Sequence, residues 1–264
     1  MARRQVVTVV GVAALLGGVL VPPSAHAQGA RGRGAAAAPP TARLAAPIDL
    51  TGYWVAVITE DWRWRMVTPP KGDYASIPLT AEGKRIADTW DPAKDQAAGE
   101  QCRAYGAPGL MRGPTRLHIT WQDDSTLKLE TDYGVQTRLL HFGSAPSASG
   151  GATWQGMTTA EWVRAAAGGR GAGRGAAPRF GSLKSMTTRL RPGYLRKNGV
   201  PYSGNAVFTE YWDVYQEENG DQWMLLTNVV EDPMYLQMPW ITSLHFKKEP
   251  DGGKWDPMPC SAAF

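Results

Sequence analysis

Two charged residues stand among large apolar side chains in segments that alternate as β-strands do. In the segment 206–216, Glu210 shares a face with Phe208 and Trp212, because residues two apart point to the same side of a strand. In a second such segment, Arg138 shares its face with apolar side chains in the same way. A lone buried charge is strongly destabilising unless it is paired. We therefore expect Glu210 and Arg138 to point into a common interior, either as a structural ion pair or as the polar floor of a cavity.

If this polar floor serves a reaction, the residue types indicate general acid–base chemistry. Glu210 or Asp132 is the candidate base, and His118, Tyr133 or Arg138 is the candidate acid or oxyanion partner. A cofactor-independent isomerase, cyclase, lyase or hydrolase would use such groups. The chain has no G-x-S-x-G elbow, which disfavours a hydrolase with a catalytic triad. Binding and catalysis both remain open at this point.

Aromatic residues are the second candidate set, since the chain has 11 tryptophans. Trp54, Phe208 and Trp212 are expected among the walls of an interior cavity. Trp62 and Trp64 alternate with arginines, so a strand extension near a barrel mouth would place both rings on one face. Such a platform suits a flat apolar ligand or a sugar ring, although an edge packed against a helix fits the pattern equally well.

Histidine spacing gives no sign of a metal site. Three histidines lie outside the first 27 residues, namely His118, His141 and His245, and none forms an H-x-H or H-x-x-x-H pair. Nor does the chain carry a glycine-rich phosphate loop. We therefore expect no metal and no cofactor.

The elements that position these residues are short alternating runs separated by turn residues. Such runs occupy 52–59, 116–121, 126–131, 135–142, 182–190, 206–216, 222–230 and 241–248. One helix is expected over 79–90, with Thr80 as its N-cap and Asp91-Pro92 at its end. Closely spaced hairpins without strand–helix alternation predict a mostly β chain, a single antiparallel barrel with one short early helix.

The first 27 residues have the features of an export signal. Arg3 and Arg4 precede an apolar run over 6–21, and Ala25-His26-Ala27 supplies the small-x-small pattern of a cleavage site. The run is shorter than the roughly 20 residues of a membrane span, and no later stretch qualifies as one. Export by the general or the twin-arginine route, to the periplasm or outside the cell, is the expectation.

Positive charge is concentrated in two tracts rich in Ala, Gly and Arg, at 28–47 and 164–181. The formal net charge is +4, and eight arginines of the signal and the tracts contribute to it, namely Arg3, Arg4, Arg31, Arg33, Arg164, Arg170, Arg174 and Arg179. Removing these eight charges changes +4 to −4, so the body of the protein is mildly acidic. We therefore interpret 28–47 as a disordered linker and 164–181 as a low-complexity insertion. No nucleic-acid partner is expected.

The two cysteines, Cys102 and Cys260, are the only ones in the chain. An even number in an exported protein predicts a disulfide. Neither has a C-x-x-C partner or a histidine nearby, which disfavours a metal or catalytic pair.

Two short motifs resemble the lipocalin (calycin) superfamily. Gly52-Tyr53-Trp54 is similar to its G-x-W signature, and Thr131-Asp132-Tyr133 is similar to its T-D-Y element. The resemblance implies a barrel that holds a ligand. Against it, the expected helix comes early, whereas lipocalins place theirs after the eighth strand.

The chain also resembles a group of uncharacterised exported proteins of soil bacteria, over most of 48–260. The residues that carry this likeness are Asp49-Leu50-Thr51-Gly52, Pro78-Leu79-Thr80, Trp90-Asp91-Pro92, Asn198-Gly199-Val200-Pro201, Thr209-Glu210, Glu231-Asp232-Pro233 and Pro239-Trp240. Many members carry a histidine near the position of 201–206, and this chain has none there, which puts any role of that histidine in doubt here.

Together these observations predict an exported lipocalin-like barrel at 48–264 that binds a small apolar or aromatic molecule in its interior. The alternative is a cofactor-independent enzyme that uses the same cavity. The sequence does not specify the ligand or the oligomeric state.

The cleavage site gives a first testable prediction. The mature protein should begin at Gln28 and be recovered outside the cytoplasm, because the small-x-small pattern ends at Ala27. Mass spectrometry of the N-terminal peptide checks this, and secreted protein that retains residues 1–27 would contradict it.

Overall fold

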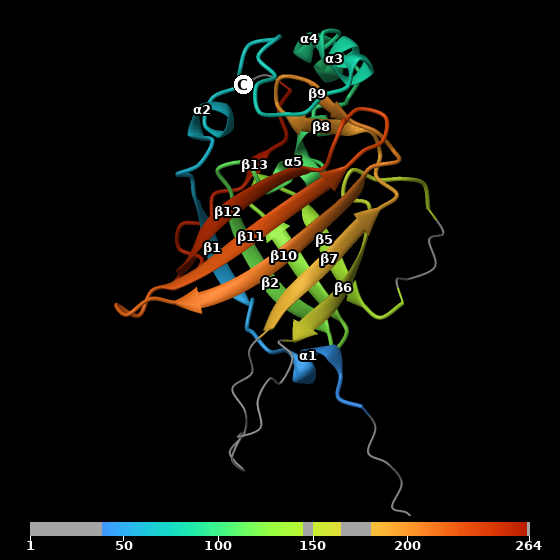
Figure 1. Ribbon diagram of the computed structural model, residues 1–264. Coiled ribbons are helices and arrows are strands. Elements are labelled where there is room, and N and C mark those ends of the chain that lie inside the picture. The colour runs from blue at the N-terminus through green and yellow to red at the C-terminus, as the bar shows by residue number, and fades with distance from the viewer. Residues whose placement is uncertain (1–38, 145–149, 165–180, 263–264) are drawn as a thin grey trace, which may run out of the picture. The chain divides into compact units, whose positions relative to one another are not determined.

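Nine strands close into a β-barrel in the computed structural model, which describes residues 39–144, 150–164 and 181–262 (Figure 1). Around the barrel their order is β1-β12-β11-β10-β7-β6-β5-β3-β2. Their bounds are β1 (Gly52–Val57), β2 (Arg116–Asp123), β3 (Thr126–Thr131), β5 (Thr137–Phe142), β6 (Met157–Arg164), β7 (Gly181–Thr188), β10 (Val207–Gln216), β11 (Gln222–Glu231) and β12 (Trp240–Glu249). The expected signal at 1–27, the linker up to 38 and most of the insertion at 164–181 lie outside the described residues.

The barrel is mixed, so the prediction of a purely antiparallel sheet was wrong. β5 and β6 run parallel, with Leu140 opposite Thr158, whereas the other barrel pairs are antiparallel. A parallel pair needs a connection of about a dozen residues or more, and residues 143–156 provide it. β6 itself was not predicted, because its polar residues hide the alternation that buries Thr158 and Ala160.

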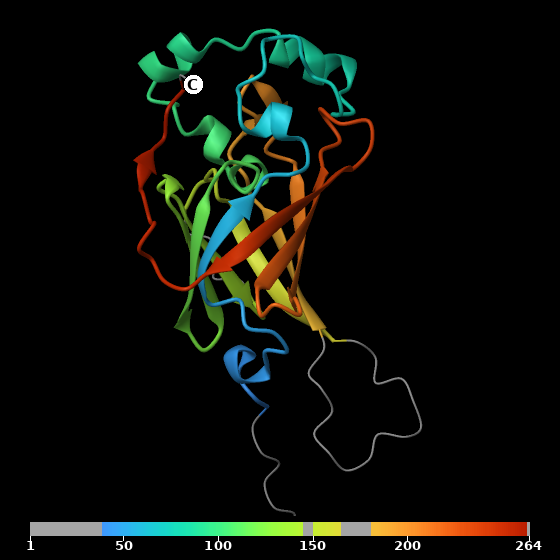
Figure 2. The ribbon, with the colours of Figure 1, turned by 90° about the vertical axis from the view of Figure 1, so that its left-hand side faces the viewer.

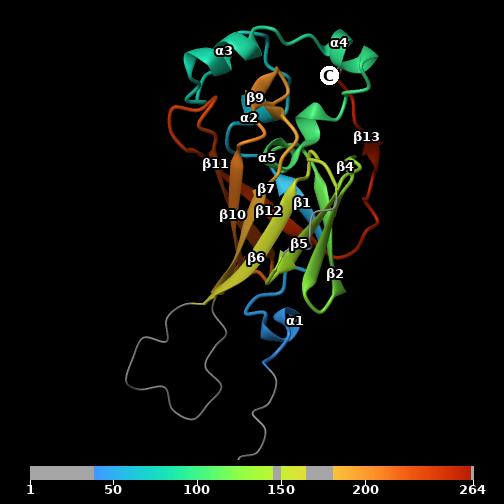
Figure 3. The ribbon, with the colours of Figure 1, turned by 90° about the vertical axis from the view of Figure 1, so that its right-hand side faces the viewer.

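One end of the barrel is covered by short helices and a hairpin, and we call it the capped end (Figures 2 and 3). More helices form here than the single one expected, although Thr80 does cap a helix at the predicted place, accepting a hydrogen bond from the Gly83 amide. The elements are α2 (Trp62–Arg65), α3 (Ala81–Ala87), α4 (Pro92–Ala97), the 3-10 helix η1 (Arg103–Tyr105), α5 (Ala107–Leu110), β8 (Gly193–Arg196), β9 (Val200–Tyr202) and the small pair β4 (Tyr133–Gly134) and β13 (Met258–Pro259).

The tryptophan–arginine segment is helical, and the predicted strand extension was wrong. Asp61 adopts a left-handed backbone conformation with φ 53° and precedes α2, whose first turn is closed by backbone bonds from Trp64 and Arg65 to the Asp61 carbonyl. Aspartate tolerates this conformation better than most residues. As a result Arg65 is buried while Trp62 is 63% exposed, so the two tryptophans do not form one face.

A short helix, α1 (Ala42–Ala45), lies at the opposite end of the barrel in Figure 1. Thr41 caps it, and the Trp162 indole donates a hydrogen bond to the Ala42 carbonyl at 2.8 Å. The stretch interpreted as a linker therefore includes a short helix among its described residues.

Two apolar clusters fill the space between these elements. The first lies inside the barrel and contains Trp54, Trp212 and Phe246; the second includes Phe208 and Trp240 and extends to Tyr202 in the hairpin of the capped end. All of these side chains are at most 5% exposed.

The disulfide forms as the sequence predicts, and it fastens the C-terminal segment to the capped end. Cys102 and Cys260 are bonded, and their sequence separation is 158. Cys102 precedes η1, and Cys260 follows β13.

Reducing this bond should lower the free energy of unfolding by about 3–5 kcal/mol, because a long loop is then no longer closed in the unfolded chain. Urea denaturation with and without reductant measures the change. A Cys102→Ala/Cys260→Ala variant is the control and should not respond to reductant. Two titratable thiols in the unreduced, denatured protein would contradict the bond.

Candidate functional site

The charged residues singled out in the sequence meet inside the barrel. The Arg138 guanidinium donates to both carboxylate oxygens of Glu210, at 2.8 Å from Nη1 and 2.5 Å from Nη2. β5 and β10 carry these residues and are not neighbours in the sheet, so the pair bridges the barrel through its interior. Both side chains are fully buried.

Hydroxyl groups next to the ion pair form hydrogen bonds with both of its members. The Ser185 hydroxyl donates to Glu210 at 3.0 Å and accepts from the Trp212 indole at 3.1 Å. Arg138 also donates to the Thr187 hydroxyl at 3.4 Å. The Glu210 carboxylate therefore accepts hydrogen bonds from a guanidinium and from a hydroxyl group. These bonds suit a structural role and disfavour a role of this carboxylate as a general base.

A buried amide beside this pair was missed by the sequence reasoning. Asn228 lies opposite Glu210 in the β10–β11 register and is 1% exposed, yet neither end of its amide has a hydrogen-bond partner among the described residues. The Arg138 Nε also lacks one. Asn228 stands two residues from Leu226 and from Val230, so it shares their strand face. The alternation that identified Glu210 could therefore have identified Asn228 as a buried polar residue.

The aromatic residues expected to line an interior cavity are packed instead. Trp54 is 0% exposed and donates its indole N–H to the Leu50 carbonyl at 2.9 Å. The ring centroid of Phe208 lies 5.6 Å from the Arg138 guanidinium. These rings occupy the space around the ion pair as core.

The remaining acid–base candidates lie apart from Glu210. His118 lies on the outer face of β2, stacked on Tyr53 with ring centroids 4.2 Å apart. Asp132 is buried and accepts the Arg116 amide at 2.7 Å, so it shapes the chain next to β4. The fold does not gather these groups around one reacting atom.

A different polar cluster lies at the capped end, around a cavity of about 20 Å³. Helix α2, the segment after α5, and the β8–β9 hairpin contribute its walls. Four of the lining residues are cations and none is an acid; the full set is Trp64, Arg65, Ala104, Gly109, Arg112, Gly113, Tyr133, Leu195, Arg196 and Lys197.

Two of these cations have carboxylate partners from the chain just before α2. Arg65 pairs with Glu60 and donates its Nε to the Arg112 carbonyl at 2.8 Å. Arg112 pairs with Asp61 at 3.0 Å, and its guanidinium lies 4.8 Å from the Trp240 ring centroid. Each still has one buried nitrogen without a partner among the described residues, Nη2 of Arg65 and Nη1 of Arg112.

Arg196 is held differently, by neutral groups. It donates to the carbonyls of Asp73 and Ala75, at 3.4 and 3.1 Å, and to the Ser76 hydroxyl at 3.2 Å. Its guanidinium faces the Trp64 ring at 5.1 Å, and its Nε has no partner among the described residues. It is 4% exposed, and no ion pair involves it within that part of the chain.

Burial makes the charged forms of these arginines costly. It lowers the pKa of Arg65 to about 10, an effect that the Arg112 charge reinforces and Glu60 opposes. Burial and the Arg112 charge likewise lower the pKa of Arg196 to about 10. The pKa of Arg112 is also lowered by burial, although Asp61 acts in the opposite direction. Arg112 is thus close enough to Arg65 and to Arg196 to lower the pKa of each.

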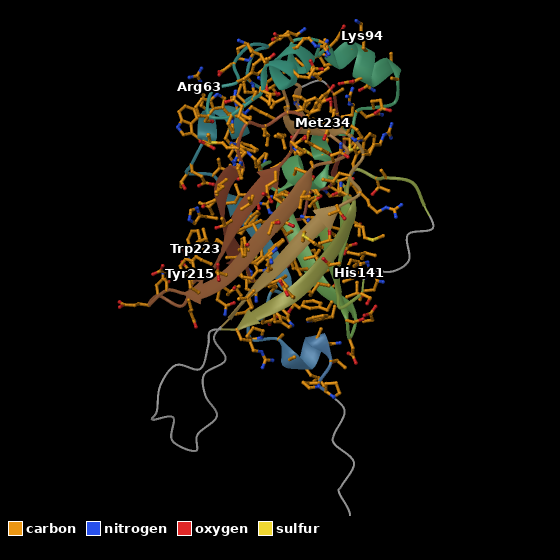
Figure 4. All side chains as sticks on the ribbon, turned by 45° about the vertical axis from the view of Figure 1, so that its right-hand side comes forward. Arg63, Lys94, His141, Tyr215, Trp223 and Met234 are labelled. Atoms are coloured by element: carbon orange, nitrogen blue, oxygen red, sulfur yellow. A yellow bond between two sulfur atoms is a disulfide. The ribbon has the colours of Figure 1, made fainter. Side chains whose placement is uncertain are left out.

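Two residues named from the sequence border this cavity. Trp64 donates its indole N–H toward Asp73 at 3.3 Å, and its ring faces Arg196. Tyr133 packs on Tyr105, and its buried hydroxyl has no partner among the described residues. Trp62, by contrast, is exposed on α2, the helix that also carries Arg63, which is labelled in Figure 4.

Metal and membrane features were also sought in the part of the chain that the structure describes. It contains no group of three or more His, Cys, Asp or Glu residues placed to hold a metal ion. His245 contacts Glu60 and His141 contacts Thr126, in separate places. None of the helices in that part is both long enough and apolar enough to span a bilayer.

Comparison with known proteins adds no relative: no family model, no curated protein and no solved structure matches the chain. The closed barrel is consistent with a lipocalin-like architecture, and membership of a family is not shown. The function must therefore be argued from the two polar clusters.

Sequence reasoning missed the arginine cluster because its members come from three distant segments. Arg112 follows the short helix α5, and Arg196 ends the four-residue strand β8, and neither element is long enough for a period in the sequence to mark burial. The only available signal was Arg65, in the tryptophan–arginine segment, and the strand interpretation placed it on the wrong face.

The interior pair gives a testable prediction about stability. Glu210→Gln alone should lower the free energy of unfolding by about 3–5 kcal/mol, because it leaves the Arg138 charge buried and unpaired. The double change Arg138→Met/Glu210→Leu should leave it about unchanged or higher, since the packed apolar surroundings accept both side chains. Urea denaturation of the single and double variants measures both effects. A double variant as unstable as the single one would contradict a purely structural pair.

Proposed function

We propose that this protein binds a small molecule, and that the site is the cavity at the capped end. The observation that carries the proposal is the set of unpartnered buried donors around one cavity, on Arg65, Arg112 and Arg196. A buried donor without an acceptor costs roughly 1–3 kcal/mol, and more when it is charged. A ligand that brings acceptors would remove this cost.

The walls of the cavity suit a compact ligand with an apolar or aromatic part. Trp64 and Tyr133 present rings at its border, beside the guanidinium groups. Binding sites commonly combine such apolar walls with a few convergent polar groups. This retains the aromatic ligand expected from the sequence and moves its site from the barrel interior to the capped end.

The interior and the enzyme alternative have weaker support. An apolar ligand inside the barrel would have to displace Trp212 or Phe208, which are at most 1% exposed. A reaction that uses Glu210 or Asp132 as base would need a carboxylate now engaged by Arg138 and Ser185, or by the Arg116 amide. The interior binding site and the enzyme therefore both stay predictions, because no described pocket is lined by Glu210 or Asp132.

An exported protein fits this role. The Cys102–Cys260 disulfide is typical of an oxidising compartment, and the features of residues 1–27 predict export. We propose that the protein meets its ligand in the periplasm or outside the cell.

The experiment uses the Tyr133 hydroxyl, which has no hydrogen-bond partner among the residues that the structure describes. Tyr133→Phe should leave the melting temperature unchanged or slightly higher, because the hydroxyl is buried and unpartnered. It should reduce the fraction of protein that carries a small molecule when it is purified from its native host, measured by native mass spectrometry.

Tyr211→Phe is the matched control, since Tyr211 is 36% exposed on the outer face of β10. It should retain the ligand as the unchanged protein does. The proposal fails if the unchanged protein carries no small molecule and no member of a library of small acids and neutral compounds raises its melting temperature.

A further inference from the structure

The charge at the capped-end cavity indicates what chemical group its ligand carries, an inference that rests on the function proposed above. Arg65 and Arg112 each have a carboxylate partner, in Glu60 and Asp61. Arg196 has only carbonyl and hydroxyl acceptors among the described residues. Among the described residues, Arg196 is therefore the one of these three arginines that forms no ion pair with a carboxylate.

This lack is costly in a way that neutral acceptors do not remove. Carbonyl and hydroxyl groups orient the Arg196 guanidinium without pairing its charge, and Arg112 adds a like charge nearby. Asp61 and Asp73 oppose this effect on the Arg196 pKa, but neither forms an ion pair with Arg196, and burial still lowers that pKa to about 10. A buried charge without a counter-ion is strongly destabilising. The Trp64 ring, whose centroid lies 5.1 Å from the guanidinium, offsets a part of this cost through a cation–π contact.

The position of Arg196 is fixed by its neighbours, so the group is not free to move into solvent. Asn198, two residues along, is 0% exposed and donates its amide to the carbonyls of Pro70 and Asp73, at 3.1 and 2.9 Å. The same 70–76 segment accepts from Arg196. The guanidinium is thus preorganised at the cavity wall.

The size of the cavity limits the missing anion. A volume of about 20 Å³ holds roughly one water-sized group. This favours a halide ion or the end of a carboxylate over the four oxygens of a phosphate. Guanidinium donors also match carboxylate geometry.

We infer that the capped-end cavity binds an anionic group of the size of a carboxylate or a halide ion, with Arg196 as its counter-ion and Arg65 and Arg112 as further donors. The source is either the carboxylate of a small organic acid or a free halide. Glu60 and Asp61 hold Arg65 and Arg112 in place and exclude a second anion.

The test compares anions with neutral molecules of the same shape. Protein exchanged into halide-free buffer is titrated with sodium acetate, acetamide, sodium benzoate, benzamide, sodium chloride and sodium phosphate, by calorimetry and by melting temperature. We expect acetate and benzoate, or chloride, to bind and to raise the melting temperature, and we expect both amides and phosphate to bind at least about 10-fold more weakly. Benzoate stronger than chloride assigns the site to an organic acid, and the reverse order assigns it to a halide.

Variants of Arg196 separate charge from structure. Arg196→Gln should weaken anion binding by about 10-fold to 100-fold, the range that a charge-assisted hydrogen bond provides. Arg196→Lys keeps the charge and should retain part of the binding. Arg85→Gln removes an exposed cation on α3 and should change nothing.

Each other outcome overturns the inference and is distinguishable from failure of the proposed function. Amides that bind as well as their acids, or a neutral molecule in the native-host protein, would refute the anion and leave the binding function in place. Binding that survives in Arg196→Gln would place the anion elsewhere. No binding of any probe, together with no ligand in the native-host protein, would refute both.

Discussion

The ion pair between Arg138 and Glu210 constrains the interior of this barrel more than any other single contact. It joins β5 to β10 across the lumen, and neither charge is tolerable there without the other. Ser185, Thr187 and Trp212 are arranged around it, and the apolar clusters meet on either side. A filled lumen of this kind leaves no room for a ligand beside the ion pair among the described residues.

The capped end is assembled from segments that are individually irregular. Loops and short helices are where proteins commonly place binding groups, because a rigid scaffold below can hold them in position. Here the scaffold is the barrel, and the Cys102–Cys260 bond holds the C-terminal segment against the same end. Asp61, in its left-handed conformation, directs one carboxylate to Arg112 while the chain turns into α2.

The sequence predicts those parts of the structure that depend on a regular period. The barrel strands other than β6 are visible in the sequence as alternation, whereas the short strands β4, β8 and β9 are not. The same alternation places Glu210 and Arg138 on the inner face of their strands. The Thr80 cap and the disulfide follow from local chemistry. The parallel direction of β5 and β6 could not be predicted from local chemistry, because the composition of a strand does not determine its direction relative to its neighbour.

The candidate site could not be predicted for a related reason. Arg65, Arg112 and Arg196 become neighbours only after α2, α5 and β8 pack together. A buried arginine in an irregular segment has the same local sequence as an exposed one. Its burial is a property of the tertiary fold.

The pairing of β1 with β12 has a consequence for the time course of folding. β1 lies between β2 and β12 in the barrel, so its second edge stays unpaired until residues 240–249 exist. Contacts between such distant segments form slowly, because a long loop must be closed first. During synthesis, a chain that lacks its last segment would expose the edges of both β1 and β11, which are templates for aggregation. These two edges stay unpaired until residues 240–249 have been made and have joined the barrel.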